Sequence, residues 1–318
     1  MKETDLIKKY FLPLSKNFKP SISLQDDGAI LKNFNKENFI ISVDCFIEGV
    51  HCPNGLEPKL MIIRAIYCAT SDLAAMASIP YCMFLSLTIP KNKEESFLKN
   101  ISTGIGETIN KIGISLAGGD LTSHDGPLII SVTVVGRKKS FTKPLLRKGS
   151  KVGDYIGITG FIGDAHIGLN ILENKIKISD SKLKKHAVNS FLLPPQLHKF
   201  ACHLSKYAKA CIDISDGLVD DIKKLSDLAD CGISLSEERI PISDNAKFFL
   251  KKGKFTLEDY LTAGDDYQLA FTFNRKNIRH IKNLEKKFKL KISIIGELIN
   301  KKGVFLNNKI IRGSFSHF

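Results

Sequence analysis

The sequence contains no tryptophan, and none of its seven cysteines stands in a Cys-x-x-Cys pair. An odd number of scattered cysteines argues against a secreted disulfide framework, and the missing pairs argue against a zinc ribbon. Glycine and proline are too scarce for a collagen-like or low-complexity chain. With 43% hydrophobic and 25% charged residues, the composition excludes intrinsic disorder. We therefore expect a folded protein of the reducing cytoplasm.

Acidic residues are outnumbered by basic ones, and the formal net charge is +14. The lysines are spread in short runs such as Lys8-Lys9 and Lys251-Lys252 rather than in one block. No basic stripe interleaved with aromatic residues is present, nor any of the common nucleic-acid-binding motifs. A solvated basic surface is the favoured interpretation, and we expect no nucleic-acid partner. A basic nucleic-acid-binding protein is the alternative, and it would show steeply salt-dependent binding.

Long apolar runs are also scarce. The polar N-terminus, Met1 to Asp5, is followed by no apolar core, which is unlike a signal peptide. Residues 73–90 contain no charged side chain and approach the length of a membrane span. Pro80 interrupts this stretch, and its second half alternates as a strand does. It therefore predicts a helix end, a turn and a buried strand, and we expect no membrane association.

A chain of 318 residues is long enough for two domains. The composition of the chain changes at residues 138–154, which are polar and contain Pro144, Gly149 and Gly153. We place a boundary here, with an N-terminal domain at 1–145 and a C-terminal domain at 146–318. Helical and strand patterns mix in both halves without strict alternation. This favours two α+β domains over one doubly wound sheet.

Lone acids recur at the ends of predicted apolar elements, each near glycine, serine or threonine. Burying a carboxylate without compensation is costly, so a set of them indicates bound divalent cations. Oxygen ligands without histidine or cysteine clusters indicate Mg²⁺ rather than zinc. Acids, Mg²⁺ and glycine amides together are suited to holding a polyphosphate. The sites are Asp26-Asp27-Gly28, Asp44 after strand 39–43, Ser71-Asp72 in the helical stretch 57–77 (one helix, or two that meet near Thr70), Gly118-Gly119-Asp120 after strand 114–117, Asp213 and Asp216 at the end of strand 211–214, and Gly264-Asp265-Asp266 before strand 267–273.

Each acidic motif also has a structural interpretation. Asp72 and Asp216 could cap helices, and Gly118-Gly119-Asp120 could form a turn. The recurrence of the pattern carries the argument. Neither a Walker A lysine motif nor Gly-x-Gly-x-x-Gly is present, which argues against an ordinary NTPase, a protein kinase and a Rossmann enzyme.

The motifs together resemble those of the thiamine-monophosphate kinase family. Residues 43–51 read VDCFIEGVH, close to the family's Thr-Asp-x-x-x-Glu-Gly-Val-His stretch, and residues 71–76 read SDLAAM as the family does. GGD at 118–120, IDISDGL at 212–218, GDDY at 264–267 and the closing His317-Phe318 follow in the family's order. The wider superfamily includes aminoimidazole ribonucleotide and selenophosphate synthetases and a hydrogenase-maturation enzyme.

The resemblance implies ATP-dependent phosphorylation of thiamine monophosphate to thiamine diphosphate, with Mg²⁺ as cofactor. It also implies a homodimer whose N-terminal mixed sheets pair into a β-barrel, ATP bound along the N-terminal domain, and a C-terminal α+β sandwich on the substrate side. The matching magnesium positions are Asp27, Ser42, Val43, Asp44, Asp72, Asp120, Asp213 and Asp216. The ATP-contacting positions are Gly119, Asp120, Arg147 and Ser215, and the substrate-contacting positions are His51, Asp265 and Phe315.

The chain departs from the family at a few of these positions. Val43 stands where threonine is frequent, which is harmless where a backbone carbonyl is the ligand. Asp265 replaces a glutamate and is one methylene shorter, which leaves its substrate contact open. The acceptor is already an anionic phosphate, so no general base is needed and direct in-line transfer is the simplest mechanism. We expect Asp72, Asp213 and Asp216 to carry the catalysis.

Two rival enzyme activities lie within the same superfamily, selenophosphate synthesis and aminoimidazole synthesis. Selenophosphate synthesis calls for a reactive cysteine or selenocysteine near the N-terminus, whereas the first cysteine here is Cys45. Parallel assays with the different acceptors would separate these activities.

Overall fold

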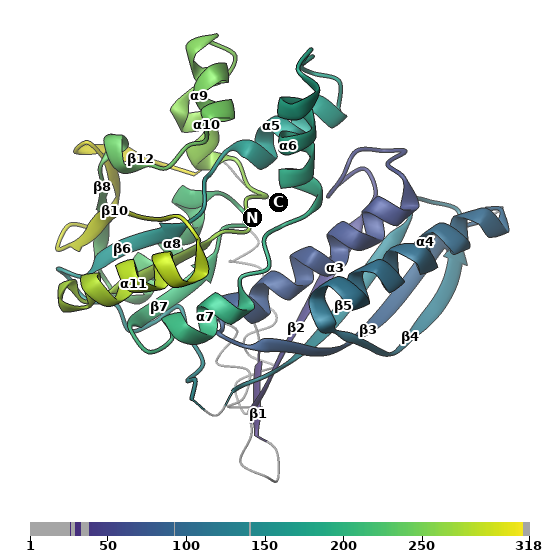
Figure 1. Cartoon of the computed structure of the whole chain (residues 1–318), viewed down its shortest axis with the longest axis horizontal. Coiled ribbons are helices and arrows are strands. Elements are labelled where there is room, and N and C mark those ends of the chain that lie inside the picture. Colours follow the sequence, from purple (N-terminus) through teal and green to yellow (C-terminus); the bar gives the residue numbers. More distant parts are fainter. Residues whose placement is uncertain (1–25, 27–28, 33–37, 92, 140, 314–318) are drawn as a thin grey trace.

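The computed structural model describes residues 26, 29–32, 38–91, 93–139 and 141–313. The chain forms two α+β lobes, each built on its own mixed β-sheet, as the sequence predicts (Figure 1). Within the described residues, one sheet has five strands and the other has seven. Two of the predicted site residues, Asp27 and Phe315, lie outside the described residues.

The N-terminal lobe carries the five-stranded sheet, in the order β1-β2-β5-β3-β4. The β3–β4 pair is parallel and the other pairs are antiparallel. The elements are β1 (Ala29–Lys32), β2 (Asn38–Ile47), α3 (Pro58–Ala75), β3 (Ile79–Pro90), α4 (Glu95–Thr108), a π-helical turn (Ile109–Gly113), β4 (Ser115–His124) and β5 (Ile129–Arg137).

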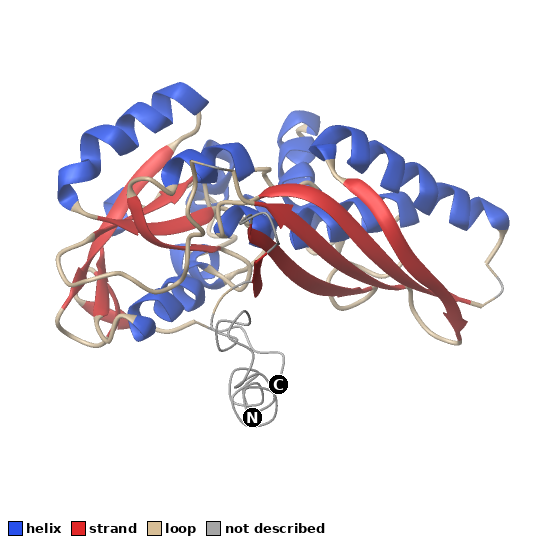
Figure 2. Ribbon diagram, turned by 90° about the horizontal axis from the view of Figure 1, so that it is seen from below, coloured by secondary structure: helices blue, strands red, loops and turns tan. Residues whose placement is uncertain are grey.

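The helices α3 and α4 cover one face of this sheet, and no described helix covers the other face (Figure 2). The alternation in β5 reflects this asymmetry, because Ile130, Val132 and Val134 are fully buried while the residues between them are partly exposed. On the uncovered face, Val43 of β2 is 60% exposed and Phe84 of β3 is 45% exposed. The sheet is therefore a half-covered layer with apolar residues on its open side.

The stretch 73–90 that lacks charge folds as the sequence predicts, into the end of α3, a turn and the strand β3. None of the helices in the described ranges is long and apolar enough to cross a membrane.

Helix α3 is buried around nearly its whole circumference. It begins with Pro58 in its first turn, where the missing N–H costs nothing, and runs for 18 residues. One side packs on β2 and β5 of its own lobe, and another side packs on α7 and β7 of the second lobe. A helix enclosed from both sides has few polar positions, which explains why its hydrophobic pattern is so continuous.

The C-terminal lobe carries the seven-stranded sheet, in the order β12-β11-β8-β10-β6-β9-β7. Its elements are β6 (Tyr155–Thr159), α5 (Asp164–Leu172), α6 (Ser181–Leu192), α7 (His198–Leu204), β7 (Ala208–Asp213), α8 (Leu218–Leu228), β8 (Gly232–Leu235), a short 3₁₀ turn (Glu237–Arg239), α9 (Asp244–Lys251), α10 (Leu257–Thr262), β9 (Leu269–Phe273), a second 3₁₀ turn (Arg275–Asn277), α11 (Ile278–Phe288), β10 (Ile292–Ile299), β11 (Gly303–Leu306) and β12 (Lys309–Ile311).

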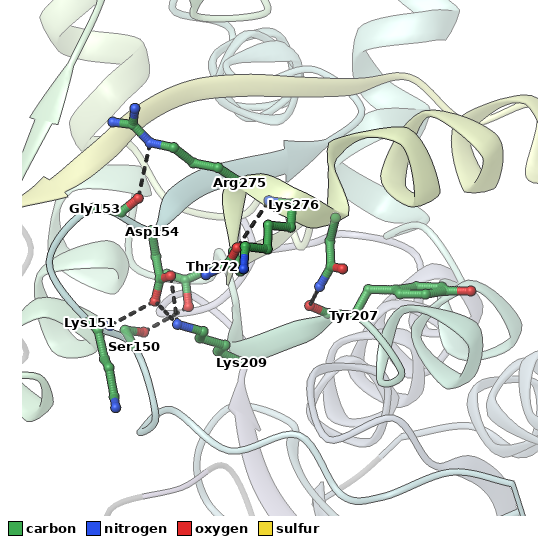
Figure 3. Close-up of polar contacts among 11 residues, drawn as sticks. Ser150, Lys151, Gly153, Asp154, Tyr207, Lys209, Thr272, Arg275 and Lys276 are labelled. Atoms are coloured by element: carbon green, nitrogen blue, oxygen red, sulfur yellow. Dashed lines mark hydrogen bonds and ion pairs between the residues drawn. The ribbon is translucent and has the colours of Figure 1, made fainter.

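The segment that leads into this second sheet is held by a cluster of polar contacts (Figure 3). The side chain of Asp154 is almost completely buried, and its two oxygens accept hydrogen bonds from Lys209 Nζ at 2.6 and 2.8 Å. Ser150 Oγ and Thr272 Oγ1 lie 2.7 Å apart, and Arg275 donates to the carbonyl of Gly153. These contacts tie the connecting segment to β7 and β9 at the end of the sheet away from Asp213.

Candidate functional site

Two serine–aspartate hydrogen bonds connect three elements where the lobes meet. Ser42 Oγ of β2 donates to Asp72 Oδ2 of α3. The residue before Asp72 makes the second bond, from Ser71 Oγ to Asp213 Oδ2 at 2.7 Å. Asp213 is the last residue of β7 in the second lobe. The Ser71-Asp72 pair of one helix therefore links the two sheets.

The acids at this junction disfavour one another's charge. Burial raises the pKa of Asp44 to about 6, and the neighbouring carboxylates of Asp213 and Asp216 add to the shift. Burial, followed by Asp213 and Asp44, raises the pKa of Asp72 well above its usual range. Burial also raises the pKa of Asp213. A cluster of this kind is a strong attractor for positive charge.

A turn after β7 presents the fourth acid of the cluster, Asp216. The side chain of Asp221, in the first turn of α8, accepts hydrogen bonds from the backbone N–H groups of Ser215 and Asp216 at 2.9 and 3.0 Å. Lys224 Nζ lies 2.7 Å from Asp216 Oδ2 and 2.8 Å from Asp221 Oδ1. Asp221 thus fixes the turn, and Lys224 supplies a positive charge within the acidic cluster.

The connecting segment brings Arg147 to the same place. The N–H of Cys211 in β7 donates to the carbonyl of Leu146, so this segment runs beside the strand that ends at Asp213. The positive charge of Arg147 lowers the pKa of Asp213 against the effect of burial. The N–H of Arg147 also donates to Asp26 Oδ1 at 2.7 Å. The sequence-predicted arginine therefore lies near the predicted acids.

The donor set fits a hard divalent cation. The four carboxylates of Asp44, Asp72, Asp213 and Asp216 offer only oxygen ligands, and their mutual repulsion would be relieved by Mg²⁺. In the described part of the chain, no three histidine, cysteine or acidic side chains are arranged to hold a metal ion as they stand. The geometry thus shows neighbouring acids with unfavourable charge rather than a preformed coordination sphere.

Asp120 lies apart from these four acids. It sits on the edge strand β4, and the register pairs it with Ser86, then Ser131, then Cys45 across the sheet. Asp120 on β4 and Cys45 on β2 are therefore three strand spacings apart. At about 4.8 Å for each spacing, the distance between the two strands is about 14 Å. Asp120 and Asp44 therefore cannot share one ion within a single chain in this arrangement.

The Gly118-Gly119-Asp120 motif was expected to follow the end of a strand, but it lies within β4. A Cβ on Gly119 would stand 1.9 Å from the carbonyl oxygen of Leu85, so close strand packing requires glycine there. Val43 directs its side chain to the open face, where it is 60% exposed. Only its backbone carbonyl could serve as a metal ligand.

Two predicted substrate-contacting residues, His51 and Asp265, are connected by a buried arginine. His51 Nδ1 accepts a hydrogen bond from the N–H of Ile47 at 2.9 Å. Arg64 Nε donates to the carbonyl of His51, and Arg64 Nη2 forms an ion pair with Asp265 Oδ1. Arg64 of α3 thus contacts a predicted substrate-side residue from each lobe.

Four residues of this site were missing from the sequence prediction: Arg64, Ser71 as a hydrogen-bond donor, Asp221 and Lys224. One signal for Arg64 was available, because it precedes Ser71 by seven residues and so shares its helical face. For Asp221 and Lys224 the sequence offered no signal, except that both lie in the first turns of a helix that follows the Asp216 motif.

The fold defines the class of protein. Residues 25–138 match the family "AIR synthase related protein, N-terminal domain", and residues 151–308 match "AIR synthase related protein, C-terminal domain". The chain of the HypE-HypF complex shares the fold, with a TM-score of 0.75 at 17% identity over 97% of this chain and 99% of that one. The chain is therefore a two-lobed protein of the AIR synthase related class.

Within that class, two further comparisons are closer in sequence. A thiamine-monophosphate kinase of Buchnera aphidicola subsp. Schizaphis graminum is 33% identical over 99% of this chain and 98% of its own length. The solved structure described as "AaThiL complexed with AMPPCP and TMP" superposes with a TM-score of 0.86 at 26% identity, covering 100% of this chain and 97% of that one. The chain belongs to the thiamine-monophosphate kinase family.

Proposed function

We propose that this protein transfers the γ-phosphoryl group of ATP to the phosphate of thiamine monophosphate, forming thiamine diphosphate and ADP. The observation that carries the proposal is the acidic cluster that Ser42 and Ser71 assemble from both lobes. Family membership over the whole chain, and the nucleotide analogue and TMP named for the solved relative, point to the same reaction.

The acids fall into two pairs, one beside the ATP donor and one beside the phosphate acceptor. Asp44 and Asp72 face the ATP side, and Asp213 and Asp216 lie at the end of β7 on the acceptor side. Gly119, Ser215 and Arg147 contact ATP in this proposal, while His51, Asp265 and Phe315 contact thiamine monophosphate. The ATP side corresponds to residues 1–145 and the acceptor side to residues 146–318.

Mg²⁺ bound at this junction would neutralise the charge of the two phosphates that must meet. The residues that would hold it are Asp27, Ser42, the carbonyl of Val43, Asp44, Asp72, Asp120, Asp213 and Asp216. Because Asp120 lies about three strands from Asp44, the proposal assigns it to an ion separate from the one between Asp44 and Asp72. The acceptor phosphate is the nucleophile, so direct in-line transfer needs no base from the chain.

The proposal includes a homodimer formed through the uncovered face of the N-terminal sheet. Val43, Thr133, Phe84 and Gly118 form one row across this face, and two of them are large exposed apolar residues. An apolar sheet face without a cover is a typical association surface. Two such faces packed together would close the sheets into the expected barrel. A cytoplasmic location remains part of the proposal.

The purified chain should be incubated with ATP and Mg²⁺ and with three acceptors in parallel, namely thiamine monophosphate, thiamine and an aminoimidazole precursor. We expect ADP and thiamine diphosphate to form in equal amounts with thiamine monophosphate only. Turnover of the aminoimidazole precursor in its place would contradict the proposal and favour the rival superfamily activity.

A further inference from the structure

Arg64 is a buried charge that the proposed mechanism leaves unused, and it is the largest fully buried side chain among the described residues. Its side chain is 1% exposed and lies on α3, between the two lobes. An arginine is rarely enclosed in this way unless every part of its guanidinium group has a partner. The partners of Arg64 therefore indicate what it does.

Those partners are three segments that converge on the acceptor site. Nη2 pairs with Asp265 Oδ1 in the loop before β9, and Nε donates to the carbonyl of His51 after β2. Nη1 donates to the carbonyl of Phe191 in α6, and the guanidinium carbon lies 3.6 Å from the centre of the Phe191 ring. The planar guanidinium presents its five N–H donors in a rigid fork, so it fixes the directions of these three partners more firmly than the rotatable ammonium of lysine would.

The same face of α3 makes further contacts with the second lobe. Arg64, Cys68 and Ser71 follow one another at helical spacing, and they meet Asp265, Tyr267 and Asp213 in turn. The ion pair of Arg64 is thus one end of a line of contacts whose other end is the acidic cluster.

The Asp265 loop is held in a conformation that a free loop would not favour. Asp265 and Tyr267 both have left-handed backbones, with φ of 74° and 48°. Their N–H groups donate to the carbonyls of Ser215 and Ile214, which join this loop to the Asp216 turn. Strained residues of this kind persist where surrounding contacts fix them, and Arg64 supplies the side-chain contact.

The Asp265 carboxylate is left with one oxygen to offer. Oδ1 is taken by Arg64, whereas Oδ2 accepts no hydrogen bond from any described residue, and the side chain is 29% exposed. A carboxylate fixed by one oxygen and open at the other is suited to accept a hydrogen bond from an amino group or ring N–H of a substrate.

We infer that Arg64 is a positioning residue for the acceptor substrate, which aims Asp265 and anchors the His51 segment so that both meet thiamine monophosphate. This inference rests on the proposed function and adds to it. Arg64 would govern the binding of the acceptor and not that of ATP, because its partners all lie at the acceptor end.

The test compares Arg64→Met and Arg64→Lys with Arg275→Met as the matched control. Arg275 also pairs with an acid, Glu297, donates to a carbonyl and lies over an aromatic ring, Tyr155, but it sits at the far end of the second sheet. KM is measured separately for thiamine monophosphate and for ATP. Wild-type turnover, measured first, tests the proposed function alone.

We expect Arg64→Met to raise the KM for thiamine monophosphate about 30-fold, with the KM for ATP changed less than about twofold. Arg64→Lys should recover part of the loss because it keeps the charge. Arg275→Met should leave both constants unchanged. An equal rise in both KM values, or no rise in either, would overturn the inference while leaving the kinase activity established.

A double-mutant comparison tests whether Arg64 acts through Asp265. Asp265→Asn should itself raise the KM for thiamine monophosphate, and adding Arg64→Lys to it should raise that KM by a smaller factor than Arg64→Lys does in the wild type. If the KM of the double variant instead rises by the product of the two single-variant factors, Arg64 and Asp265 act independently, and the positioning role is overturned. This comparison also decides the matter where Arg64→Met does not fold.

Discussion

Individual buried side chains at the junction carry charges that the protein alone does not compensate. Asp44, Asp72 and Asp213 all have raised pKa values, with burial as the largest cause. Lys224 offsets part of the charge through Asp216, but the remaining acids still face one another. Replacing one of the repelling carboxylates with its amide should therefore harm function without harming the fold.

We expect Asp44→Asn, Asp72→Asn and Asp120→Asn each to lower turnover at least about 100-fold while keeping the wild-type circular dichroism spectrum. In thermal unfolding, Mg²⁺ should raise the midpoint temperature of Asp44→Asn and Asp72→Asn by less than it raises that of the wild type. These two substitutions remove oxygen ligands from the cluster and relieve repulsion in the metal-free protein.

The matched control is Asp227→Asn, since Asp227 is an exposed aspartate paired with Lys223 on the outside of α8. It should retain wild-type turnover and the full Mg²⁺ effect. Wild-type turnover in any of the three site variants, with metal still bound, would remove that residue from the proposed metal-binding set.

His198, in α7, gives a separate prediction about pH and stability. Its Nε2 donates to the carbonyl of Thr70 at 2.7 Å, and burial lowers its pKa from 6.5 to about 4. Between these two values the unfolded chain binds a proton that the native protein does not. Stability should therefore fall as the pH falls from 6.5 to 4, by about 3 kcal/mol from this residue.

The raised pKa values of the site acids act in the opposite direction, so the measurement must be a difference. Unfolding by urea should be followed between pH 4 and 7 for wild type, His198→Gln and His203→Gln. Glutamine keeps a donor at the place of Nε2 but takes up no proton, so the advantage of wild type over His198→Gln should shrink toward pH 4. His203 lies only partly buried on the same helix, and its variant should parallel wild type. Parallel curves for all three proteins would refute the prediction.

Among the secondary-structure elements, α3 shows what the sequence predicts well. Its apolar periodicity indicated a helix over residues 57–77, and the structure has it at Pro58–Ala75. The Ser71-Asp72 pair was predicted to belong to the site. Its hydrogen-bond partners were not predictable, because Ser71 and Asp213 are separated by 142 positions in the chain. Helical periodicity reports which residues share a face, but not which distant strand that face will meet.

Strand β4 shows where sequence reasoning fails. The strand was expected to end before Gly118 because paired glycines are typical of turns. It continues to His124, since glycine also serves where a neighbouring strand approaches too closely for a Cβ atom. This difference moves Asp120 from a strand end to an edge strand, away from the other acids.

Helix α6 was not predicted at all. Its polar sequence, SKLKKHAVNSFL, buries only Ala187, Phe191 and Leu192, so its apolar face is narrow. The helix begins where Asp180 accepts hydrogen bonds from the N–H groups of Lys182 and Leu183. Its last residues matter for the site, because Phe191 is a partner of Arg64.

On the scale of the whole molecule, the uncovered sheet face predicts the state of association. The chain should run at twice its own mass in sedimentation at micromolar concentration. Phe84→Glu should convert it to a monomer, because a charge would be buried at the centre of the paired faces. A wild-type protein that is monomeric at that concentration would contradict the prediction.

The control for this variant is Phe248→Glu. Phe248 is as exposed as Phe84, at 45%, but it lies on α9 of the second lobe. It should leave the sedimentation of the protein unchanged. Dissociation by both variants would point to general loss of structure instead of a specific sheet interface.

The arrangement of acids across the two lobes also predicts how the reaction proceeds. Asp213 ends a strand of the second lobe and reaches the cluster through Ser71. Because the proposal places ATP on the first lobe, Asp213→Asn should cut turnover at least about 100-fold with little change in the affinity for ATP. Equilibrium binding of a non-hydrolysable ATP analogue measures that affinity directly, and a parallel loss of both would place Asp213 on the ATP side.

Direct transfer further predicts that no phosphorylated protein forms. When the wild-type enzyme is incubated with γ-labelled ATP and Mg²⁺ in the absence of thiamine monophosphate, no label should remain on the denatured chain. The two phosphates repel each other, and the barrier falls once the charge between the lobes is neutralised, so the chain has no need of a covalent carrier. Stable label would refute direct transfer. His51 and Cys45, two nucleophilic side chains close to Asp44 in the sequence, would then be replaced first, and loss of label in one of these variants would identify the carrier.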